Sequence, residues 1–490
     1  MSIAEKLKQY KNKNIHIVGI GGAEGSAIVE FLVANGISSI TGHDFSEKSD
    51  FKKAFNNTHL SLKPKEREEA LNHLLNLPII INFKDHYLKD IEEADIVFVS
   101  QVWFKYPQNM PILENLKDNR IPFKTITNLY FELAPCQIIS VTGTNGKTTT
   151  SRLIYSIFEK WKKENRQVKI FFAGNDRQNV QVLDKLQEMR KDDVLILETS
   201  STQLLLNSDI SPHIGVITNI SPNHLDDHGS FENYIDAKKN LIRHQKKDDF
   251  AVLNYDDLQT RKIAEEFKDN SFLFSRKEKL KEGCFKDGDK IIIRKKNKEV
   301  YVLNIKDIKI PGNHNLENIL AAISSAYLFG IGPEVINIGI SKYTGTKHRL
   351  NLLYNIDGIK YYDDTQATTP EATVAGIESF DDDIILFAGG DDKGMNYKEM
   401  AKKINDKVRL LILFPGDASE KIENLINKNK IDFVKVNNLK QAIEELKRYY
   451  KKTELTKGST VLISPGAAHF YSKFVESTNK TLKDWIKLLK

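Results

Sequence analysis

The sequence is poor in cysteine and has no long hydrophobic run. Its two cysteines, Cys136 and Cys284, are too few for a disulfide framework and have no metal-ligand spacing. No apolar segment is long enough to cross a bilayer, and the first ten residues lack the apolar core of a secretory signal. We therefore expect a reduced, cytoplasmic protein that does not insert into membranes.

A large excess of charge of one sign is also missing. The 72 basic and 66 acidic side chains give a net charge of +6, and the lysines form no stripe interleaved with aromatics. This balance does not favour nucleic acid as a partner, whereas a small anionic substrate fits it. The chain also lacks internal repeats and low-complexity tails. Because its 490 residues exceed one hydrophobic core, we expect about three domains.

A phosphate loop is the most informative segment that the chain does contain. A β-branched run over 138–142 turns at Gly143 and Gly146 and leads into a helical pattern over 152–158. Backbone N–H groups at such a turn bind an anion, Lys147 reaches the outer phosphates, and the Thr148 hydroxyl ligates Mg²⁺. The spacing is two residues tighter than the general Walker pattern, and the alternative is an ordinary glycine turn between strand and helix.

A βαβ unit precedes this loop. A buried strand over 15–18 is followed by a glycine turn over 19–25, a helix over 26–35 and a second strand that ends at Asp44. The pattern resembles a dinucleotide fingerprint whose third glycine comes one position late. It indicates either a nucleotide held by its phosphates and Asp44, or a turn that only packs a helix closely against a strand.

Two strand ends after the loop carry polar residues. An apolar strand over 193–197 delivers Glu198, which is where a metal-holding acid is expected beside a phosphate loop. Another strand over 214–219 is followed by a polar cluster that includes His224. This histidine is either a metal or phosphate contact or a capping or core residue. The helix over 231–238 brings Lys238 toward the same opening, unless it is a solvated surface lysine.

The rest of the chain continues the α/β pattern. Short charged strands over 250–302 indicate a peripheral antiparallel elaboration, and Asn315 and Asn318 open a helix that they either cap or use to read a base. Apolar strands over 358–362, 383–388, 408–414 and 459–464 alternate with helices. We predict an α/β protein of three domains: 1–127, Rossmann-like; 128–344, a central P-loop ATPase-type domain with a mainly parallel sheet; and 345–490, Rossmann-like.

These motifs, taken in order, resemble the Mur ligase family over essentially the whole chain. The matching segments run from the phosphate loop through Glu198, 219–224, Lys238, 312–318 and His348-Arg349 to 389–394. Within the family, the segments 198–204, 224–231, 364–368 and 463–468 are most similar to the branch that adds D-glutamate. The resemblance implies an ATP-dependent amide ligase of peptidoglycan precursor synthesis, with an acyl-phosphate intermediate and with ADP and phosphate as products.

The resemblance also implies partners, cofactors and site residues. The substrates would be ATP, UDP-N-acetylmuramoyl-L-alanine and D-glutamate, bound by a monomer that holds Mg²⁺ at two sites and carries a carbamylated Lys238. The implied catalytic residues are Lys147, Glu198, His224 and Lys238, of which the last three join Thr148 as metal ligands. The implied ATP contacts are Gly143, Thr144, Asn145, Gly146, Lys147, Thr148, Thr149, Asn315, Asn318, Arg349 and Asp364. The first domain and its neighbours would bind the UDP substrate through Gly21, Gly22, Asp44, Asn175, Ser200 and Gln203. The third domain would bind the amino acid through Gln366, Thr368, Lys393, His469 and Phe470.

Departures from the family pattern concentrate at the amino-acid site. The D-glutamate adders usually have lysine where this chain has Gln366 and serine where it has His469. Glutamine cannot supply the charge that pairs with a side-chain carboxylate, which the histidine would partly replace. Asn351 stands where a glutamate is usual, and no Asp-Asn-Pro-Arg is present, which excludes the diaminopimelate adder.

Other functions remain open on the sequence alone. L-glutamate or another amino acid would need the same chemistry, and a folate-type polyglutamate synthetase shares the central domain but not a UDP-binding first domain. A nucleotide-binding switch without ligase chemistry has no need of a second metal site. A dinucleotide-dependent oxidoreductase is indicated by the first glycine turn alone.

Overall fold

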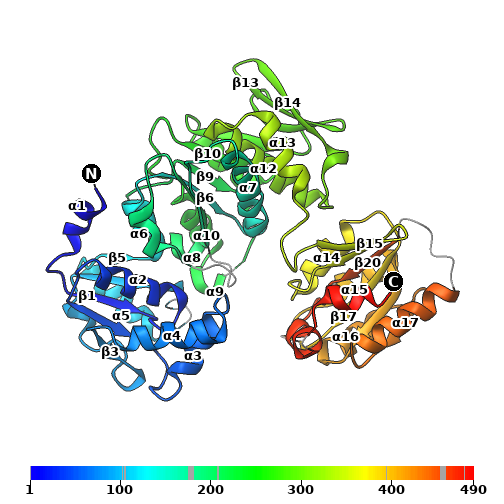
Figure 1. Ribbon diagram of the computed structural model, residues 1–490, viewed down its shortest axis with the longest axis horizontal. Coiled ribbons are helices and arrows are strands. Elements are labelled where there is room, and N and C mark those ends of the chain that lie inside the picture. The colour runs from blue at the N-terminus through cyan, green and yellow to red at the C-terminus, as the bar shows by residue number, and fades with distance from the viewer. Residues whose placement is uncertain are drawn as a thin grey trace. The chain divides into compact units, whose positions relative to one another are not determined.

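The computed structural model describes residues 2–101, 103, 106–174, 181–206, 209–223, 225–392, 394–452, 459–478 and 480–489. These residues form three sheets in two compact units (Figure 1). The first unit comprises 1–305 and 317–340, and the second comprises 306–316 and 341–490. No helix in the described ranges is long and apolar enough to span a membrane.

The first sheet has five parallel strands in the order β3-β2-β1-β4-β5. Its strands are β1 (Ile15–Val18), β2 (Ile40–His43), β3 (Ile80–Asn82), β4 (Ile96–Val99) and β5 (Phe123–Lys124). The helices of this region are α1 (Ile3–Leu7), α2 (Ala23–Ala34), α3 (Phe51–Thr58), α4 (Pro64–Leu75), α5 (Asn109–Asp118) and α6 (Ile126–Leu133). The βαβ unit predicted at the start of the chain is therefore confirmed.

The second sheet has nine strands in the order β14-β13-β12-β11-β10-β9-β6-β8-β7. They are β6 (Gln137–Thr142), β7 (Ile170–Gly174), β8 (Val194–Glu198), β9 (Ile214–Ile217), β10 (Phe250–Asn254), β11 (Ser271–Ser275), β12 (Gly283–Asp287), β13 (Lys290–Lys295) and β14 (Lys298–Asn304). The helices are α7 (Lys147–Lys162), α8 (Ser201–Leu204), α9 (Leu225–His228), α10 (Phe231–Lys239), α11 (Leu258–Glu266), α12 (Asn313–Phe329) and α13 (Pro333–Lys342).

The antiparallel elaboration predicted over 250–302 is correct only in its second half. β10 pairs in parallel with β9, and β11 pairs in parallel with β10, so both strands extend the central sheet rather than leave it. Only β12, β13 and β14 pair antiparallel. The prediction was wrong for β10 and β11 because the partner of a strand is a distant segment, which its own composition does not reveal.

The third sheet, in the second unit, has the order β15-β16-β20-β17-β18-β19, with only β15 and β16 antiparallel. Its strands are β15 (Asn351–Ile356), β16 (Ile359–Asp363), β17 (Ile384–Gly389), β18 (Val408–Phe414), β19 (Asp432–Lys435) and β20 (Thr460–Ile463). Its helices are α14 (Pro370–Glu378), α15 (Lys398–Lys407), α16 (Asp417–Leu425), α17 (Leu439–Lys452) and α18 (Leu482–Lys487). Alternate residues of β17 enter two different cores, with Leu386 in one and Phe387 in the other. A sheet covered on both faces explains why its strands are continuous apolar runs.

The predicted domain borders fall in different structural contexts. The border at 127/128 lies inside α6, and one buried cluster contains Phe98 of the first sheet together with Ile138 and Leu195 of the second. The border at 344/345 lies between α13 and β15, four residues after the first unit ends. Three domains with these bounds stay a prediction.

A buried histidine pair connects the two central strands of the first sheet. His43 Nδ1 accepts a hydrogen bond from the Leu88 backbone N–H, so its Nε2 carries the proton and donates to His16 Nδ1 over 2.9 Å. Burial, reinforced by His16, lowers the pKa of His43 to about 3, and burial also lowers the pKa of His16. Both rings are therefore neutral in the folded protein.

Acidification is expected to destabilise this sheet selectively. Because the folded-state pKa of His43 lies below the ordinary value of 6.5, the unfolded chain binds more protons. The free energy of unfolding is therefore fully retained above about pH 6.5 and falls, through His43, by up to about 1.4 kcal/mol per pH unit as the pH decreases toward 3. Hydrogen exchange of β1 and β2 amides between pH 4 and 7 measures this slope. His43→Asn should reduce it and exposed His86→Asn should not, so an unchanged slope in His43→Asn would contradict the assignment.

Candidate active site

The glycine loop lies between the central strand β6 and the helix α7, and the predicted order of strand, loop and helix is confirmed. Gly143 and Gly146 have φ values of +149° and +84°, which L residues rarely adopt. A Cβ at Gly143 would lie 1.9 Å from Thr218 Oγ1, and one at Gly146 would lie 2.2 Å from Asn318 Oδ1. The loop therefore requires glycine at both positions.

The lysine of the loop begins α7 and folds back over it. Lys147 Nζ donates to the carbonyl oxygens of Gly143 at 2.8 Å and Thr144 at 2.9 Å. The Asn145 backbone N–H donates to Asn219 Oδ1 after β9, which fixes the loop from the other side. A cation is thus held at the mouth of a helix N-terminus, which is suited to a phosphate chain.

A hydroxyl and a carboxylate meet at the next strand end. Thr148 Oγ1 donates to Glu198 Oε1 at 3.1 Å, and both side chains are buried. β8, which ends at Glu198, pairs directly with β6, so the topology brings the two together. Hard oxygen ligands of this kind suit Mg²⁺, which keeps several waters. The described residues contain no cluster of three or more histidine, cysteine or acidic side chains placed to hold a metal.

Lys238 is buried, which excludes the alternative of a solvated surface lysine. It is only 1% exposed, and its Nζ lies 4.5 Å from the centroid of the Tyr234 ring. Among the described residues it has no carboxylate partner. Burial, and to a lesser extent Lys147, lowers the pKa of Lys238 well below its ordinary value. The Tyr234 hydroxyl lies 3.1 Å from Thr144 Oγ1, so this lysine belongs to the surroundings of the glycine loop.

The helix α12 contacts the region of the glycine loop, although it lies more than 150 residues later in the chain. Asn318 Oδ1 accepts a hydrogen bond from Thr150 Oγ1 at 3.3 Å, whereas Asn315 Nδ2 donates to the Pro311 carbonyl. α12 begins at Asn313, so both asparagines lie within the helix and not at its cap, contrary to the capping alternative.

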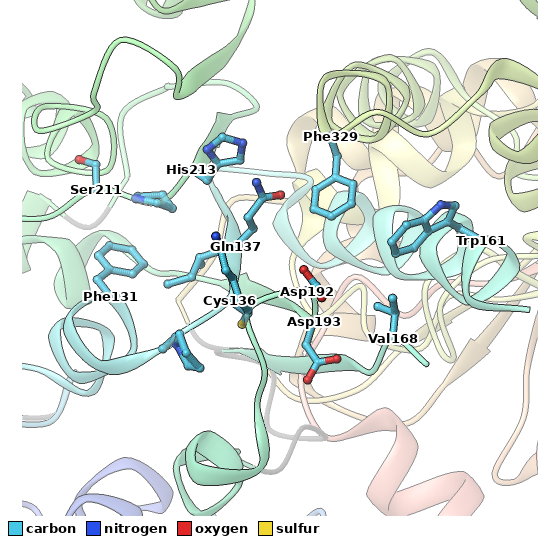
Figure 2. Close-up of a pocket in the computed structure, with 15 residues that line it drawn as sticks. Phe131, Cys136, Gln137, Trp161, Val168, Asp192, Asp193, Ser211, His213 and Phe329 are labelled. Atoms are coloured by element: carbon cyan, nitrogen blue, oxygen red, sulfur yellow. The ribbon is translucent and has the colours of Figure 1, made fainter. Parts of the chain in front are cut away.

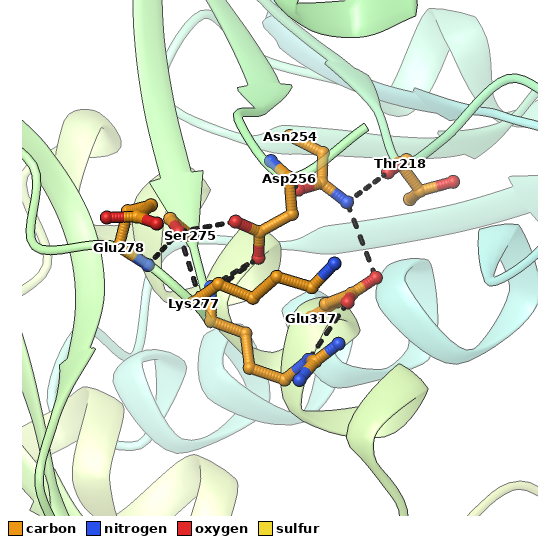
Figure 3. A network of polar contacts seen from close by, with 8 residues as sticks. Thr218, Asn254, Asp256, Ser275, Lys277, Glu278 and Glu317 are labelled. Carbon is orange, nitrogen blue, oxygen red and sulfur yellow. Dashed lines mark hydrogen bonds and ion pairs between the residues drawn. The ribbon is translucent and has the colours of Figure 1, made fainter. Parts of the chain in front are cut away.

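A polar network fixes α12 to the carboxyl ends of the central strands (Figure 3). Asn254, at the end of β10, donates from Nδ2 to the Thr218 carbonyl at 3.0 Å and to Glu317 at 3.4 Å. Arg276 Nε donates to the same Glu317 at 3.0 Å. The sequence alone did not indicate Glu317, which sets the position of the adjacent Asn318.

At the end of β2 in the first sheet, the Asp44 side chain contacts the glycine turn. Its Oδ2 accepts from the Gly21 backbone N–H at 2.9 Å, and its Oδ1 accepts from Ser46. Gly22 caps α2 without a side chain, and a Cβ at Gly25 would lie 2.3 Å from the Gly19 carbonyl oxygen. The turn thus packs α2 closely against the strand. Close packing does not exclude a ligand, so nucleotide binding by Gly21, Gly22 and Asp44 stays a prediction.

The segment after β8 presents two of the predicted substrate contacts. Ser200 caps α8 by accepting from the Gln203 backbone N–H, and Gln203 Oε1 accepts from the Ser200 N–H at 2.9 Å. Both side chains are buried. Three further predicted site residues, Asn175, His224 and Lys393, lie outside the described residues.

In the second unit, the His-Arg segment is held against the end of β16. His348 has a φ of +66° and its Nδ1 lies 2.7 Å from Asp363 Oδ2, while the neighbouring Arg349 is exposed. Asp364 accepts from the Leu350 N–H and from Ser464 Oγ. Burial raises the pKa of Asp364 to about 7 against the lowering effect of these hydrogen bonds.

The predicted amino-acid contacts divide into exposed and buried residues. Gln366, Thr368 and His469 are exposed, and His469 has a φ of +60°. Phe470 instead lies in the core, where its ring packs 4.8 Å from Phe414, so its side chain is not presented to a ligand. The sequence-based reasoning missed Lys473, although its i+4 spacing from His469 is a helical signal.

A cavity of about 600 Å³ opens at the amino ends of the strands of the second sheet (Figure 2). Gln137, Asp193 and His213, which line it, begin or directly precede β6, β8 and β9. Ligands of open parallel sheets bind at the carboxyl ends of the strands. The cavity is therefore separate from the glycine loop, which follows the other end of β6.

Comparisons with known proteins agree with this arrangement. The family model described as the Mur ligase middle domain matches residues 141–326, and the one described as the Mur ligase, glutamate ligase domain matches residues 348–466. The MurF ligase from Thermotoga maritima in complex with ADP has a similar fold, with 17% identity, a TM-score of 0.54 and coverage of 99% of this chain and 97% of that one.

Curated relatives match over nearly the full length. The UDP-N-acetylmuramoylalanine--D-glutamate ligase of Acetivibrio thermocellus is 32% identical, covering 96% of this chain and 96% of its own. The protein of the same name from Alkaliphilus oremlandii is 33% identical, covering 98% and 99%. With both family domains and this extent of identity, the chain belongs to the Mur ligase family.

Proposed function

We propose that the protein is an ATP-dependent ligase that joins D-glutamate to UDP-N-acetylmuramoyl-L-alanine in peptidoglycan precursor synthesis. The observation that carries the proposal is the glycine loop with Lys147 at its mouth and the Thr148–Glu198 pair and buried Lys238 beside it. The printed names of the full-length relatives supply the two substrates.

The first step is a phosphoryl transfer. A carboxylate oxygen of the acyl substrate attacks the γ-phosphorus of ATP, and the bond from this phosphorus to the β,γ-bridging oxygen breaks. The products are ADP and an acyl phosphate. The loop N–H groups and Lys147 hold the phosphates in line, since such transfers depend on positioning and charge neutralisation. Thr148, Glu198 and His224 would hold Mg²⁺ at two sites, where it neutralises phosphate charge when bound.

The second step forms the amide. The uncharged amine of the amino acid attacks the acyl carbon, phosphate leaves, and the amine loses a proton. Asn315, Asn318, Arg349 and Asp364 would keep the nucleotide in place through its base, phosphates and ribose during both steps. At Asp364 the raised pKa leaves a substantial neutral fraction near pH 7, so a ribose hydroxyl would meet a donor as well as acceptors.

Lys238 suits carbamylation because it is buried and because burial lowers its pKa well below the ordinary value, which favours the neutral amine. In that reaction the amine nitrogen attacks CO₂ and loses one proton, which leaves a carbamate with two oxygen atoms. A buried cation beside Lys147 would repel it, whereas a carbamate provides oxygen ligands for Mg²⁺. The modification would turn a buried amine into part of the metal site.

A lysine and a histidine that share one carboxylate support an acidic amino acid as the second substrate. Lys473 Nζ and His469 Nδ1 lie 2.6 Å and 2.8 Å from the two oxygens of Asp391, and the three side chains are partly exposed. This lysine supplies a positive charge that Gln366 lacks. A side-chain carboxylate of the substrate would replace Asp391 as the partner of Lys473 and His469.

Product formation with a panel of amino acids tests the function. With ATP, Mg²⁺ and UDP-N-acetylmuramoyl-L-alanine, we expect phosphate release and the matching product mass with D-glutamate, and at least about tenfold lower kcat/KM with D-glutamine, which lacks the charge. Lys473→Met should raise the KM for D-glutamate and leave that for ATP unchanged. Equal turnover of neutral amino acids would contradict the acidic specificity, and absence of product with every amino acid would contradict the ligase.

A further inference from the structure

A buried carboxyl group lies at the start of α2, directly after the glycine turn of the first sheet. Glu24 is 8% exposed, and its Oε1 accepts hydrogen bonds from Gln101 Nε2 at 2.6 Å and Gln203 Nε2 at 2.5 Å. The second oxygen, Oε2, is buried and has no hydrogen-bond partner among the described residues. The side chain of Glu24 thus connects three elements: α2, which carries it, α8, and the segment that follows β4. It retains one oxygen that makes no hydrogen bond.

The surroundings of Glu24 favour a neutral carboxylic acid. Burial raises the pKa of Glu24, and only the amides of Gln101 and Gln203 act in the opposite direction. No ion pair involves Glu24 in the part of the chain that the structure describes. With Oε1 accepting two N–H groups, a proton on this carboxyl group would sit on Oε2, which is the oxygen without a hydrogen-bond partner and would then be a donor that lacks an acceptor.

A second unused polar atom lies at the same turn. Ser100 Oγ is buried and also has no hydrogen-bond partner in the described ranges. It lies against the glycine turn, because a Cβ placed on Gly19 would be 2.3 Å from it. β1 ends at Val18 and β4 at Val99, so both unused atoms follow the carboxyl ends of neighbouring parallel strands, where open sheets bind ligands.

Glu24 also determines how a predicted substrate contact is oriented. The Gln203 amide is fixed at its oxygen by the Ser200 N–H and at its nitrogen by Glu24. Without Glu24, that nitrogen would lose its acceptor and the amide would be free to turn. The carboxyl group therefore affects Gln203 as well as any ligand that Oε2 itself reaches.

We propose that Glu24 is a specificity-determining residue for the UDP-linked acyl substrate: its Oε2 donates a hydrogen bond to an acceptor oxygen of that substrate while its Oε1 orients Gln203. The inference rests on the proposed function for the identity of the substrate. A neutral acid suits this place, since an ionised carboxylate in the first turn of α2 would repel a diphosphate at the helix N-terminus. Ser100 Oγ supplies a neighbouring hydroxyl for the same ligand.

Titration calorimetry of the full chain tests the proposal with two variants. Glu24→Gln retains the shape: its carbonyl accepts from the two glutamines, and its amide N–H donates where the acid does. We expect its Kd for UDP-N-acetylmuramoyl-L-alanine within about threefold of the natural protein, and a Kd at least about tenfold higher for Glu24→Ala, which corresponds to about 1.4 kcal/mol. Glu30→Ala on the same helix is the control and should leave the Kd unchanged.

The ligand oxygen is identified by repeating the titration with UDP alone. Weaker UDP binding in Glu24→Ala assigns the acceptor to the diphosphate, and weakening confined to the complete substrate assigns it to the sugar-peptide part. Two results would overturn the proposal. One is an unchanged Kd in Glu24→Ala with a lower melting temperature, which is the result of a purely structural link. The other is equal weakening in Glu24→Gln and Glu24→Ala, which requires an ionised carboxylate.

Failure of the inference can be separated from failure of the proposed function. If the natural protein binds the acyl substrate and turns it over, but Glu24→Ala binds it as tightly, only the inference is wrong. If the natural protein binds neither UDP nor the acyl substrate, the proposed function itself is wrong.

Discussion

Replacing Lys147 with alanine is expected to lower phosphate release at least about 1,000-fold, because the variant loses the cation held at the mouth of the loop. The ammonium group donates to the carbonyl oxygens of Gly143 and Thr144, and it can exchange these contacts for the β- and γ-phosphates. The exchange costs little, since one set of charge-assisted hydrogen bonds replaces another.

The loss should be confined to the chemical step. Binding of UDP-N-acetylmuramoyl-L-alanine, measured by calorimetry, should be unchanged in Lys147→Ala, because the predicted contacts of that substrate lie at Gly21, Gly22, Asp44, Ser200 and Gln203. Lys163→Ala is a matched control: this lysine follows the last turn of α7 and is exposed. Turnover of Lys147→Ala near that of the control would refute the assignment of Lys147 as a phosphate contact.

The central features of the fold could be predicted because their signals are local. β1 was predicted at its observed residues, and β18 likewise, since both are short apolar runs bounded by turns. The glycine loop was recognised from Gly143, Gly146 and Lys147, which are close in sequence and act together. By contrast, the pairing of β10 and β11 with the central sheet depends on contacts between distant segments. These two strands carry no charged residue, unlike the antiparallel strands that follow, but composition alone does not name a strand's partner.

The site could be predicted where a residue type at the end of a strand has one common role, such as a metal-binding carboxylate. Glu198 was placed beside the loop correctly, because β8 neighbours β6 and parallel strands end at the same edge. The burial of Lys238 was not visible in the sequence, since a lysine on a helix usually faces solvent. Glu24 carries no signal of its own, and the spacing of Lys473 from His469 indicates only a shared helix face. The role of each depends on a partner, Gln203 or Asp391, that lies far away along the chain.

The second large effect is expected at Lys238. Lys238→Ala should lower turnover at least about 100-fold, because it removes the nitrogen on which the carbamate oxygens would be built. If those oxygens are what the reaction needs, acetate or propionate should restore part of the activity in a saturable manner. The neighbouring Lys239 offers a control, since it forms an ion pair with Glu266 at 2.6 Å, and Lys239→Ala should retain turnover.

The pKa of Lys238 explains why this particular lysine would react with CO₂. An ordinary lysine is protonated near pH 7 and has no lone pair to attack carbon, whereas burial beside Lys147 favours the neutral amine. Intact-protein mass spectrometry at neutral pH in bicarbonate should therefore find an added CO₂ that is absent from Lys238→Ala and present in Lys239→Ala. Full turnover in Lys238→Ala would remove the lysine from the mechanism. Lost turnover that no short carboxylate restores, together with an unmodified natural protein, would leave a buried amine and not a carbamate as the active group.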